Sequence, residues 1–487
     1  MFQTLSQIGS SDPLEFDLCI IGAGPAGITI ANKLANAPFK ICLLEGGGVD
    51  GDGAGQALYH GISQGYSPLM ACRVRFFGGT TNHWTGYCRM PEEQDLRARH
   101  WEPLSGWPIS RADLDPFLPE ALQAVEVTTE FDSELWARRR GVTTLGLESP
   151  ELYEDVSLVG PPVRFRTKYR EAIAASRSVT CLLNANVVEL MPNEQGDRLQ
   201  EVKLKTTEGA ARTLRAKVFV LACGGIENAR LLLASDSRIP GGIGNAHDHV
   251  GRYFSDHVLR ESGTAVIMRP TEMPLLYELG RIFEPNMKVH PQIRMTMPLA
   301  EKVRTPRVII RLAAERPSRA TRLMEKVAGF WNEDAQVPRT FRISTFAEPL
   351  PLPENRITLL DERDALGMRR VKLVYTPSDL ELEAARAALQ AFARVLGASG
   401  KGRVQIDEQA LQAAPFDWGF HHYSTTKMHP DPKLGVVDTD CRVHGMANLF
   451  VAGSSVFPTA GLMTPTMTIV AMALRMAGKL QEEIHAT

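Results

Sequence analysis

The sequence lacks several features that would place it in a specialised class. Its seven cysteines form no CxxC pair and no metal-ligand spacing, and four of them lie inside apolar, strand-like runs, where a thiol behaves as a small hydrophobe: Cys19, Cys42, Cys181 and Cys223. Neither charge predominates, with 54 Lys and Arg against 56 Asp and Glu. This balance gives no electrostatic basis for binding nucleic acid or an anionic membrane. It favours a small neutral or mildly polar substrate.

Long hydrophobic runs are also missing. Residues 451–474 are apolar overall, but Ser, Thr and Pro residues interrupt them, which is typical of a loop leading into a buried helix rather than a membrane span. The N-terminal residues have neither a basic region nor an apolar region of the signal-peptide kind, so we expect a cytoplasmic protein without a membrane span. The chain contains no internal repeats, heptads or low-complexity tracts. Its 487 residues are too many for one ordinary core and suggest two domains.

A glycine-rich turn lies between two apolar runs near the N-terminus. Residues 17–21 (DLCII) precede Gly-Ala-Gly-Pro-Ala-Gly at 22–27, and a second apolar run ends at Glu45. Glycines at this spacing let the chain turn tightly, approach a pyrophosphate and pack the next helix, whose N-terminus faces the phosphates. An acid at the end of the second strand can accept hydrogen bonds from a ribose diol. The pattern predicts a dinucleotide-binding βαβ unit; the alternative is a glycine-rich turn that binds no ligand.

Two kinds of pattern follow this unit. Residues 50–110 form a long loop-rich stretch dense in Gly, aromatic and Arg residues, and loops of this length are usually functional. Residues 256–429 contain runs that mix apolar and polar residues, as antiparallel strands do, and one amphipathic helix over 378–396. Residues 430–487 return to strand, Gly turn and helix. We therefore expect an α/β fold with a discontinuous Rossmann-like cofactor domain of residues 1–255 and 430–487, and an inserted α+β substrate domain of residues 256–429 on a mainly antiparallel sheet.

Four further runs resemble one family. They are FGGTTNHW at 77–84, GRYFSDH at 251–257, HHYSTTKM at 421–428 and NLFVAGSSVFPT at 448–459. Together with the βαβ unit, they resemble the glucose-methanol-choline (GMC) oxidoreductases, and within them the sugar and polyol oxidase and dehydrogenase branch that includes pyranose oxidase. The likeness touches nearly the full chain, but residues 258–420 are less diagnostic.

The resemblance implies a bound FAD. It implies that the βαβ glycines and Glu45 hold the ADP half, that Val188 lies near the adenine, and that residues 78–82 approach the isoalloxazine. Some relatives carry a covalent bond to FAD at the position that His83 resembles, so this link stays open. The cofactor-binding residues predicted in this way are Gly22, Gly24, Ala26, Gly27, Glu45, Gly78, Gly79, Thr80, Asn82, His83, Trp84, Val188, Ala222, Gly453, Ser454, Pro465 and Thr466.

The chemistry that the resemblance implies needs a base. Moving a hydride from a carbinol carbon to flavin N5 requires the hydroxyl proton to leave, and a neutral histidine suits that role. His421 matches the family's catalytic histidine by its spacing to Ser424 and Thr425, where relatives commonly have Gly-Thr. His422 is its competitor. In an extended segment adjacent side chains point to opposite faces, so we expect only one of the two to face the flavin.

One position departs from the family pattern. Relatives usually place a histidine or an asparagine just before Pro-Thr as a hydrogen-bond partner for the substrate oxygen, whereas this chain has Thr464. Threonine can form hydrogen bonds, but it is short and cannot act as a base. The developing alkoxide would therefore have a weaker or differently placed partner. Three alternatives follow: the substrate is bound unusually, the reaction is not ordinary alcohol oxidation, or the change to Thr has no functional meaning.

These observations lead to one principal hypothesis and two alternatives. The principal one is an FAD-dependent oxidoreductase that oxidises the hydroxyl of a sugar, polyol, glycoside or natural product, with oxygen, a quinone or a cytochrome as electron acceptor. The first alternative is a non-redox lyase or isomerase in which FAD is structural and His421 performs acid-base chemistry. The second is a flavin-binding subunit that depends on a partner such as an electron-transfer cytochrome.

Overall fold

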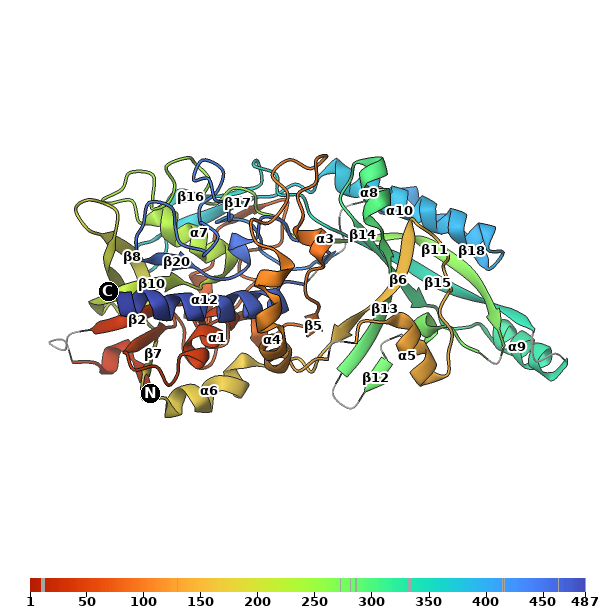
Figure 1. Cartoon of the computed structure of the whole chain (residues 1–487), viewed down its shortest axis with the longest axis horizontal. Helices are drawn as coiled ribbons and strands as arrows, with labels where there is room; N and C mark the ends of the chain where they lie inside the picture. The colour runs from red at the N-terminus through yellow and green to blue at the C-terminus, as the bar shows by residue number, and fades with distance from the viewer. Residues whose placement is uncertain are drawn as a thin grey trace.

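Two β-sheets organise the molecule, one in each of two adjoining parts (Figure 1). The computed structural model describes residues 1–9, 14–128, 130–271, 273–280, 282–284, 287–331, 335–413, 415, 417–462 and 464–486. Each sheet has its own hydrophobic core. The predicted α/β fold class, a Rossmann-like part joined to an α+β part, is confirmed.

The first sheet carries the glycine-rich turn. Over the described residues it has eight strands in the order β1-β7-β3-β2-β10-β9-β8, with β20 also paired to β10. The pairs that join β1, β7, β3, β2, β10 and β20 are parallel, and β8 and β9 add an antiparallel edge. The bounds are β1 Phe2–Thr4, β2 Glu15–Ile21, β3 Ile41–Leu44, β7 Val179–Leu183, β8 Asn186–Pro192, β9 Leu199–Lys205, β10 Ala211–Leu221 and β20 Leu449–Val451. Helices cover its central strands, which explains their uninterrupted apolar runs.

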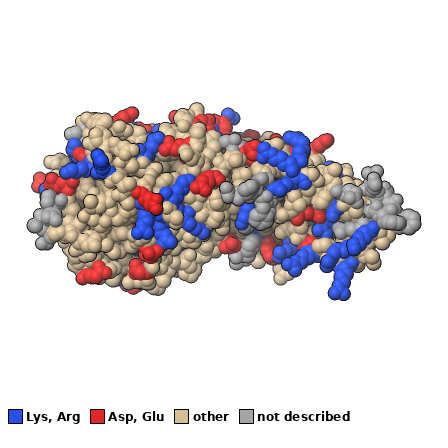
Figure 2. Space-filling model, turned by 90° about the horizontal axis from the view of Figure 1, so that it is seen from below, with Lys and Arg blue, Asp and Glu red and all other residues tan. Residues whose placement is uncertain are grey.

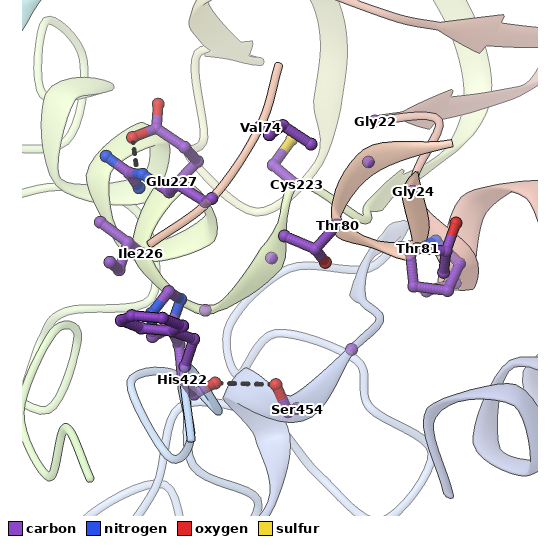
Figure 3. A pocket seen from close by; sticks show the side chains of 18 of the residues that line it. Gly22, Gly24, Val74, Thr80, Thr81, Cys223, Ile226, Glu227, His422 and Ser454 are labelled. Atoms are coloured by element: carbon purple, nitrogen blue, oxygen red, sulfur yellow. Dashed lines mark hydrogen bonds and ion pairs between the residues drawn. The ribbon is translucent and has the colours of Figure 1, made fainter. Parts of the chain in front are cut away.

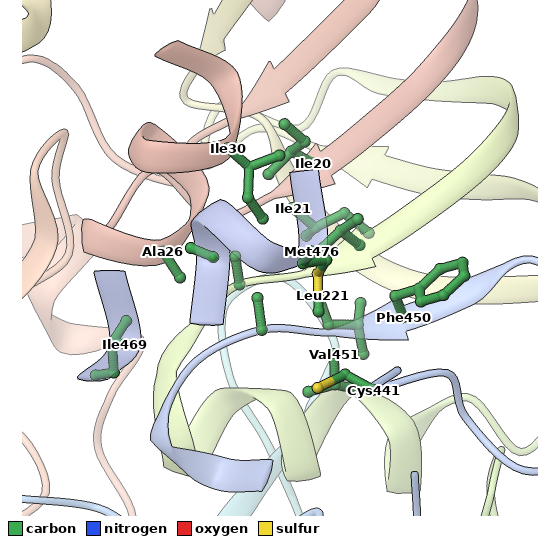
Figure 4. Close-up of a cluster of buried hydrophobic side chains, with 14 of the residues drawn as sticks. Ile20, Ile21, Ala26, Ile30, Leu221, Cys441, Phe450, Val451, Ile469 and Met476 are labelled. Atoms are coloured by element: carbon green, nitrogen blue, oxygen red, sulfur yellow. The ribbon is translucent and has the colours of Figure 1, made fainter. Parts of the chain in front are cut away.

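The C-terminal segment packs against the N-terminal unit. Helix α12 (Thr466–Ala486) contacts α1 (Pro25–Lys33), while α6 (Phe165–Ala175) packs against α1 and β7, and α7 (Gly224–Ala234) packs against β8. Figure 4 shows Ile20 of β2, Ile30 of α1 and Met476 of α12 in one apolar cluster with Val451 of β20. This packing brings the turns after β2, β10 and β20 to the same edge of the sheet.

The second sheet is antiparallel. Its order is β18-β11-β15-β14-β13-β6-β5, with β12 beside β13 and β19 beside β11. The bounds are β5 Tyr87–Cys88, β6 Leu152–Val159, β11 Val258–Pro270, β12 Ile282–Glu284, β13 Met287–Met295, β14 Val308–Ala314, β15 Gln336–Ala347, β18 Gly402–Ile406 and β19 Asp417–Trp418. The predicted helix over 378–396 is α10 (Asp379–Ala398), which begins after Ser378 and packs on β14, β15 and β18.

Two groups of strands lie on the other side of the domain boundary that the sequence predicted at residue 256. Strands β5 and β6 precede that residue but belong to the second sheet. Conversely, β16 (Arg356–Arg363) and β17 (Arg369–Val374) form a small sheet with β4 (Ile62–Gln64) and lie against α7 of the first part. Local sequence patterns report that a segment is a strand, but not which distant strand pairs with it, so the boundary could not be placed from the pattern alone.

The remaining helices are short or lie at the periphery. The α-helices are α2 Gly53–Ala57, α3 Glu93–Leu96, α4 Leu118–Val125, α5 Ser133–Arg140, α8 Met297–Val303, α9 Arg319–Trp331 and α11 Glu408–Gln412. Among the described residues, no helix is long and apolar enough to cross a membrane. On the face shown in Figure 2, basic and acidic side chains are interspersed over the first part, and basic ones are more frequent towards the other end.

Candidate active site

A cavity of about 610 Å³ lies between the two parts. One wall consists of the turns at the edge of the first sheet and includes Gly22, Glu45 and Gly453. The opposite wall is one face of the second sheet and includes Leu259, Arg311 and Phe346. Figure 3 shows the first wall, with Gly22 and Gly24 beside Thr80 and Thr81, and His422 beside Ser454. The cavity therefore lies beyond the carboxyl ends of the parallel strands, where α/β sheets bind ligands.

The glycine-rich turn fits a pyrophosphate because two of its positions exclude a side chain. Gly22 has φ +107°, and a Cβ there would lie 2.5 Å from the carbonyl oxygen of Ala222. A Cβ on Gly27 would lie 2.0 Å from the carbonyl oxygen of Gly22. Helix α1 begins after Gly24 with Pro25 at its first turn, so its N-terminus points at the cavity. Free backbone N–H groups and the helix dipole make this position suited to phosphate.

Glu45 lies where the ribose of a dinucleotide is expected. Its Oε1 accepts a hydrogen bond from the backbone N–H of Gly47 at 2.9 Å, and its Oε2 accepts one from Ala23 at 3.2 Å. Burial raises the pKa of this carboxyl group, while the Gly47 hydrogen bond and the charge of Arg75 oppose that rise. A carboxylate accepts more than two hydrogen bonds, so oxygen lone pairs remain for a ribose diol.

The loop at 77–84 forms a tight structure above the turn. The Asn82 amide donates hydrogen bonds to the carbonyl oxygens of Phe77 at 3.0 Å and Gly79 at 2.9 Å. The Trp84 indole donates one to the carbonyl oxygen of Val163 at 2.9 Å. His83 lines the cavity from this loop, and partial desolvation together with the charge of Arg164 lowers its pKa. Asn82 thus supports the loop that carries Thr80 and His83 rather than lining the cavity itself.

Most predicted site residues line the cavity. Those that do are Gly22, Gly24, Ala26, Glu45, Gly79, Thr80, His83, Trp84, Ala222, His421, His422, Gly453, Ser454, Thr464, Pro465 and Thr466. Gly27, Gly78 and Asn82 lie directly behind this lining. Val188 is not among the described lining residues, whereas its neighbour Val187 is, so the contact of Val188 with the adenine stays a prediction. The ladder between β8 and β9 shifts register between Val187 and Glu189.

Both adjacent histidines line the cavity. The backbone is not simply extended here, because Phe420 has φ +54° and Ser424 has φ +67°. His422 is buried, and its ring packs on that of Phe254 with centroids 5.6 Å apart. Its Nε2 has no hydrogen-bond partner among the described residues. Burial lowers the pKa of His422 to about 3, so the ring is neutral.

Asp256 is a positioning residue that sequence reasoning missed. Its Oδ1 accepts a hydrogen bond from the backbone N–H of His421 at 2.8 Å, and its Oδ2 accepts one from Phe420 at 2.9 Å. The Tyr66 hydroxyl donates a third, to Oδ2, at 2.6 Å. Burial raises the pKa of Asp256 to about 8, although these donors oppose the rise. Its contacts hold the backbone at the left-handed turn that presents His421.

His257 contacts the ring of His421 directly. The two Nδ1 atoms are 3.1 Å apart, and Nε2 of His257 is 2.8 Å from the carbonyl oxygen of Gly461. A carbonyl can only accept, so Nε2 of His257 carries the hydrogen. Burial lowers the pKa of His257 to about 4, so the ring is neutral and its Nδ1 can only accept. His421 must then donate from Nδ1, which leaves its Nε2 unprotonated.

Burial also lowers the pKa of His421 well below its usual value, with smaller contributions from His257, His422 and Arg311. The ring is thus neutral near pH 7, and its free nitrogen can accept a proton. Gly419 makes room for it, because a Cβ there would lie 2.6 Å from Nδ1 of His421. Asp256 and His257 belong to the GRYFSDH run at 251–257, which resembles the family but does not by itself indicate a role for either residue.

Thr464 lines the cavity, but its hydroxyl hydrogen is committed. It donates a hydrogen bond to the carbonyl oxygen of Tyr87 at 2.7 Å. A threonine hydroxyl has a single hydrogen, so in this arrangement Thr464 can only accept a hydrogen bond from a ligand. Tyr87 is in the loop-rich stretch that forms β5 of the second sheet.

A dinucleotide-binding turn at the edge of a cavity that also contains a neutral histidine is typical of nucleotide-dependent oxidoreductases. Comparison with family models narrows the class. Residues 17–244 match the model of FAD dependent oxidoreductases, and residues 351–473 match that of GMC oxidoreductases. The chain is therefore an FAD-dependent oxidoreductase, and its residues 351–473 are similar to GMC oxidoreductases.

Known relatives are distant but span much of the chain. The 2-methyl-1,2-propanediol dehydrogenase of Mycolicibacterium austroafricanum is 23% identical, over 95% of this chain and 94% of the relative. The C-glycoside 3-oxidase of Microbacterium trichothecenolyticum is 22% identical, over 84% of this chain and 76% of the relative. The paromamine 6′-oxidase of Streptomyces fradiae is 27% identical, over 54% and 45%.

Solved structures share the fold. A formate oxidase aligns with a TM-score of 0.60 at 16% identity, covering 97% of this chain and 99% of that one. A pyridoxine 4-oxidase from Mesorbium loti aligns with a TM-score of 0.57 at 18% identity, covering 95% and 98%. At these identities the likeness supports the architecture alone.

Proposed function

We propose that this enzyme oxidises the hydroxyl group of a small alcohol, on a sugar, polyol, glycoside or natural product, with His421 as the base. The observation that carries the proposal is the hydrogen-bond chain from Gly461 through His257 to His421, which leaves Nε2 of His421 unprotonated at the cavity. The names of the relatives, which include a diol dehydrogenase and glycoside oxidases, support the class of substrate.

The residues present fit an FAD. The turn at Gly22 and the start of α1 would hold its pyrophosphate, Glu45 its ribose, and the loop at Thr80 together with Gly453 the region towards the flavin ring. Bound there, the flavin supplies the acceptor for the two electrons and the hydrogen that leave the alcohol carbon.

The chain's own residues handle the proton. The substrate hydroxyl donates its hydrogen bond to Nε2 of His421 and transfers its proton there as the carbon is oxidised. The imidazolium that forms donates from both nitrogens, and its Nδ1–H still points at the Nδ1 acceptor of His257. Asp256 fixes the position of the His421 ring at the cavity, because its Oδ1 accepts a hydrogen bond from the backbone N–H of His421. A short threonine at 464 allows room for a substrate oxygen but supplies only an acceptor there.

Anaerobic addition of a panel of sugars, polyols, glycosides and aryl alcohols to the FAD-loaded enzyme tests the proposal. We expect at least one class to bleach the oxidised flavin band, and His421→Asn to slow the bleaching by at least 100-fold with FAD content unchanged. Equal rates in the two proteins would contradict the assignment of His421. A panel that leaves the flavin oxidised while the enzyme converts a substrate would favour the non-redox alternative, which apoprotein loaded with a redox-inert flavin analogue would then confirm.

The finer assignments need their own measurements. We propose oxygen, a quinone or a cytochrome as electron acceptor, and a cytoplasmic location. Re-oxidation of the reduced enzyme by air, by a soluble quinone and by cytochrome c separates the acceptors, and cell fractionation tests the location. Acid precipitation tests the link at His83: flavin that stays in the wild-type pellet and moves to the supernatant in His83→Ala would mean a covalent bond.

A further inference from the structure

One face of the second sheet forms the substrate side of the cavity. Phe346 of β15 lies opposite Leu259 of β11 and Ile309 of β14 in the strand register. Cross-strand partners share a face, and together with Leu462 these residues form a small apolar cluster. Arg311 lies two residues beyond Ile309 on β14, so its side chain belongs to the same face. A cation therefore lies beside an apolar cluster on this wall.

The Arg311 guanidinium is stacked on aromatic rings in line with the histidine pair. Its Cζ lies 4.6 Å from the ring centroid of Phe346 and 5.6 Å from that of Tyr87. The Phe346 ring stacks on His257, with centroids 4.3 Å apart and planes 9° apart. His257 in turn contacts His421. The rings of Phe346 and His257 thus lie between Arg311 and the base in this series of contacts.

The electrostatic influence of Arg311 reaches the reaction centre. After burial, which is the largest cause, its positive charge contributes to the lowered pKa of both His257 and His421. The donors closest to the base are already committed, since Thr464 donates to Tyr87 and Nε2 of His257 donates to Gly461. On this wall the other charged residue among the described lining residues is Asp417, which is exposed on β19, where water and salt screen it.

We infer that Arg311 binds an anionic group of the substrate, so that the alcohol oxidised here is a hydroxy acid with its oxidisable hydroxyl at His421 and its carboxylate at Arg311. This inference rests on the proposed function and names its substrate class. A guanidinium forms paired, charge-assisted hydrogen bonds with a carboxylate, and stacking on Phe346 fixes the plane in which it does so. It also departs from the neutral substrate that the charge balance of the whole chain suggested, because that balance says nothing of a single buried wall.

Binding without turnover gives the first test. Benzoate and its neutral analogue benzamide are titrated into the oxidised, FAD-loaded enzyme, and the perturbation of the flavin spectrum gives each dissociation constant. We expect benzoate to bind at least 10-fold more tightly than benzamide, as a charge-assisted hydrogen bond provides. In Arg311→Met this preference is lost, in Arg311→Lys part of it remains, and Arg342→Met, which removes an exposed arginine from the neighbouring strand β15, leaves it unchanged. Equal binding of the two probes by the wild-type enzyme would overturn the inference even if Arg311→Met failed to fold.

Matched substrates give the second test and separate the inference from the proposed function. Galactose with galacturonate, glycerol with glycerate, and benzyl alcohol with 4-(hydroxymethyl)benzoate are compared in anaerobic reduction of the flavin. We expect the acid of at least one pair to reduce the flavin with at least 10-fold higher efficiency, mainly through tighter binding. Neutral alcohols that match or exceed their acids would overturn the role of Arg311 and leave alcohol oxidation standing. A benzoate preference with no reduction by any of the six compounds would leave the anion site standing and count against alcohol oxidation.

Discussion

Replacement of His257 by phenylalanine tests the hydrogen-bond chain that sets the protonation of the base. The change keeps a planar ring against Phe346, where the imidazole stacks at 4.3 Å, but it removes both ring nitrogens. Nδ1 of His421 then loses the acceptor that lies 3.1 Å away, and the carbonyl oxygen of Gly461 loses its donor. His421 can then carry its hydrogen on Nε2, the nitrogen that has to take the substrate proton.

The expected decrease in the rate constant of flavin reduction follows from these contacts. A buried polar group left without its partner costs about 1–3 kcal/mol. If this cost is paid in the transition state, where Nδ1–H of the imidazolium needs an acceptor most, the rate constant falls about 10- to 100-fold, at 1.36 kcal/mol for each factor of ten. His257→Asn retains an acceptor oxygen near the place of Nδ1, so it should recover much of the lost rate.

Stopped-flow reduction of the flavin under anaerobic conditions measures that rate constant with an alcohol found in the panel. His60→Phe, which changes an exposed histidine outside the cavity lining, is the matched control. Nitrogen-15 shifts of the His421 ring report the tautomer directly, and they should show Nε2 unprotonated in the wild-type protein. The reasoning would be refuted by a folded, FAD-loaded His257→Phe that reduces its flavin within threefold of the wild-type rate, or by a wild-type ring protonated on Nε2.

Three other changes have defined outcomes. Gly22→Ala places a Cβ 2.5 Å from the Ala222 carbonyl oxygen at φ +107°, so the purified protein should contain little FAD. Gly478→Ala in α12 is the control, because its Cβ meets nothing within 4 Å; this variant should retain FAD and gain up to about 1 kcal/mol of stability. Gly419→Ala pushes against Nδ1 of His421, so flavin reduction should fall at least 10-fold while the visible absorbance of bound FAD is retained; unchanged reduction would show that the ring has room to move. Burial lowers the pKa of His257 from 6.5 to about 4, so the unfolded chain takes up a proton at a higher pH than the folded protein does. The free energy of unfolding therefore falls by up to about 3 kcal/mol as the pH falls from 6.5 towards 4. Urea unfolding at pH 7, 5.5 and 4.5 should show that this free energy falls less with pH in His257→Phe than in the wild type.

The sequence predicted what local chemistry determines. The glycine spacing at 22–27 identified the cradle because only glycine fits where the structure has φ +107° at Gly22 and a 2.0 Å approach at Gly27. The amphipathic pattern over 378–396 predicted the helix that the structure has at Asp379–Ala398. Thr464 departs from the histidine or asparagine of the family pattern. Its hydroxyl hydrogen is donated to the carbonyl oxygen of Tyr87, so it cannot donate a hydrogen bond to the substrate.

What the sequence could not predict depends on contacts between distant segments. Asp256 and His257 meet His421 only because β19 pairs with β11, and nothing in the local pattern of residues 256–429 reports that register. Arg311 is one of many arginines in the chain, and its place in the cavity follows from the order of strands in the second sheet. The bulge between Val187 and Glu189 is likewise a feature that the sequence pattern does not report.

The pairing of β20 with β10, and of α12 with α1, has a consequence for how the chain is made. Ribosomes add about 5–20 residues per second, so a chain of 487 residues takes on the order of a minute to emerge. From the synthesis of β10 until that of β20, part of one edge of β10 has no final neighbour, and the apolar face of α1 waits for α12 from an earlier point still. The nucleotide cradle at residues 22–27 is therefore buttressed only after residues 449–486 have been made. An apolar helix face and a strand edge that wait this long for their partners are sites at which a nascent chain can aggregate.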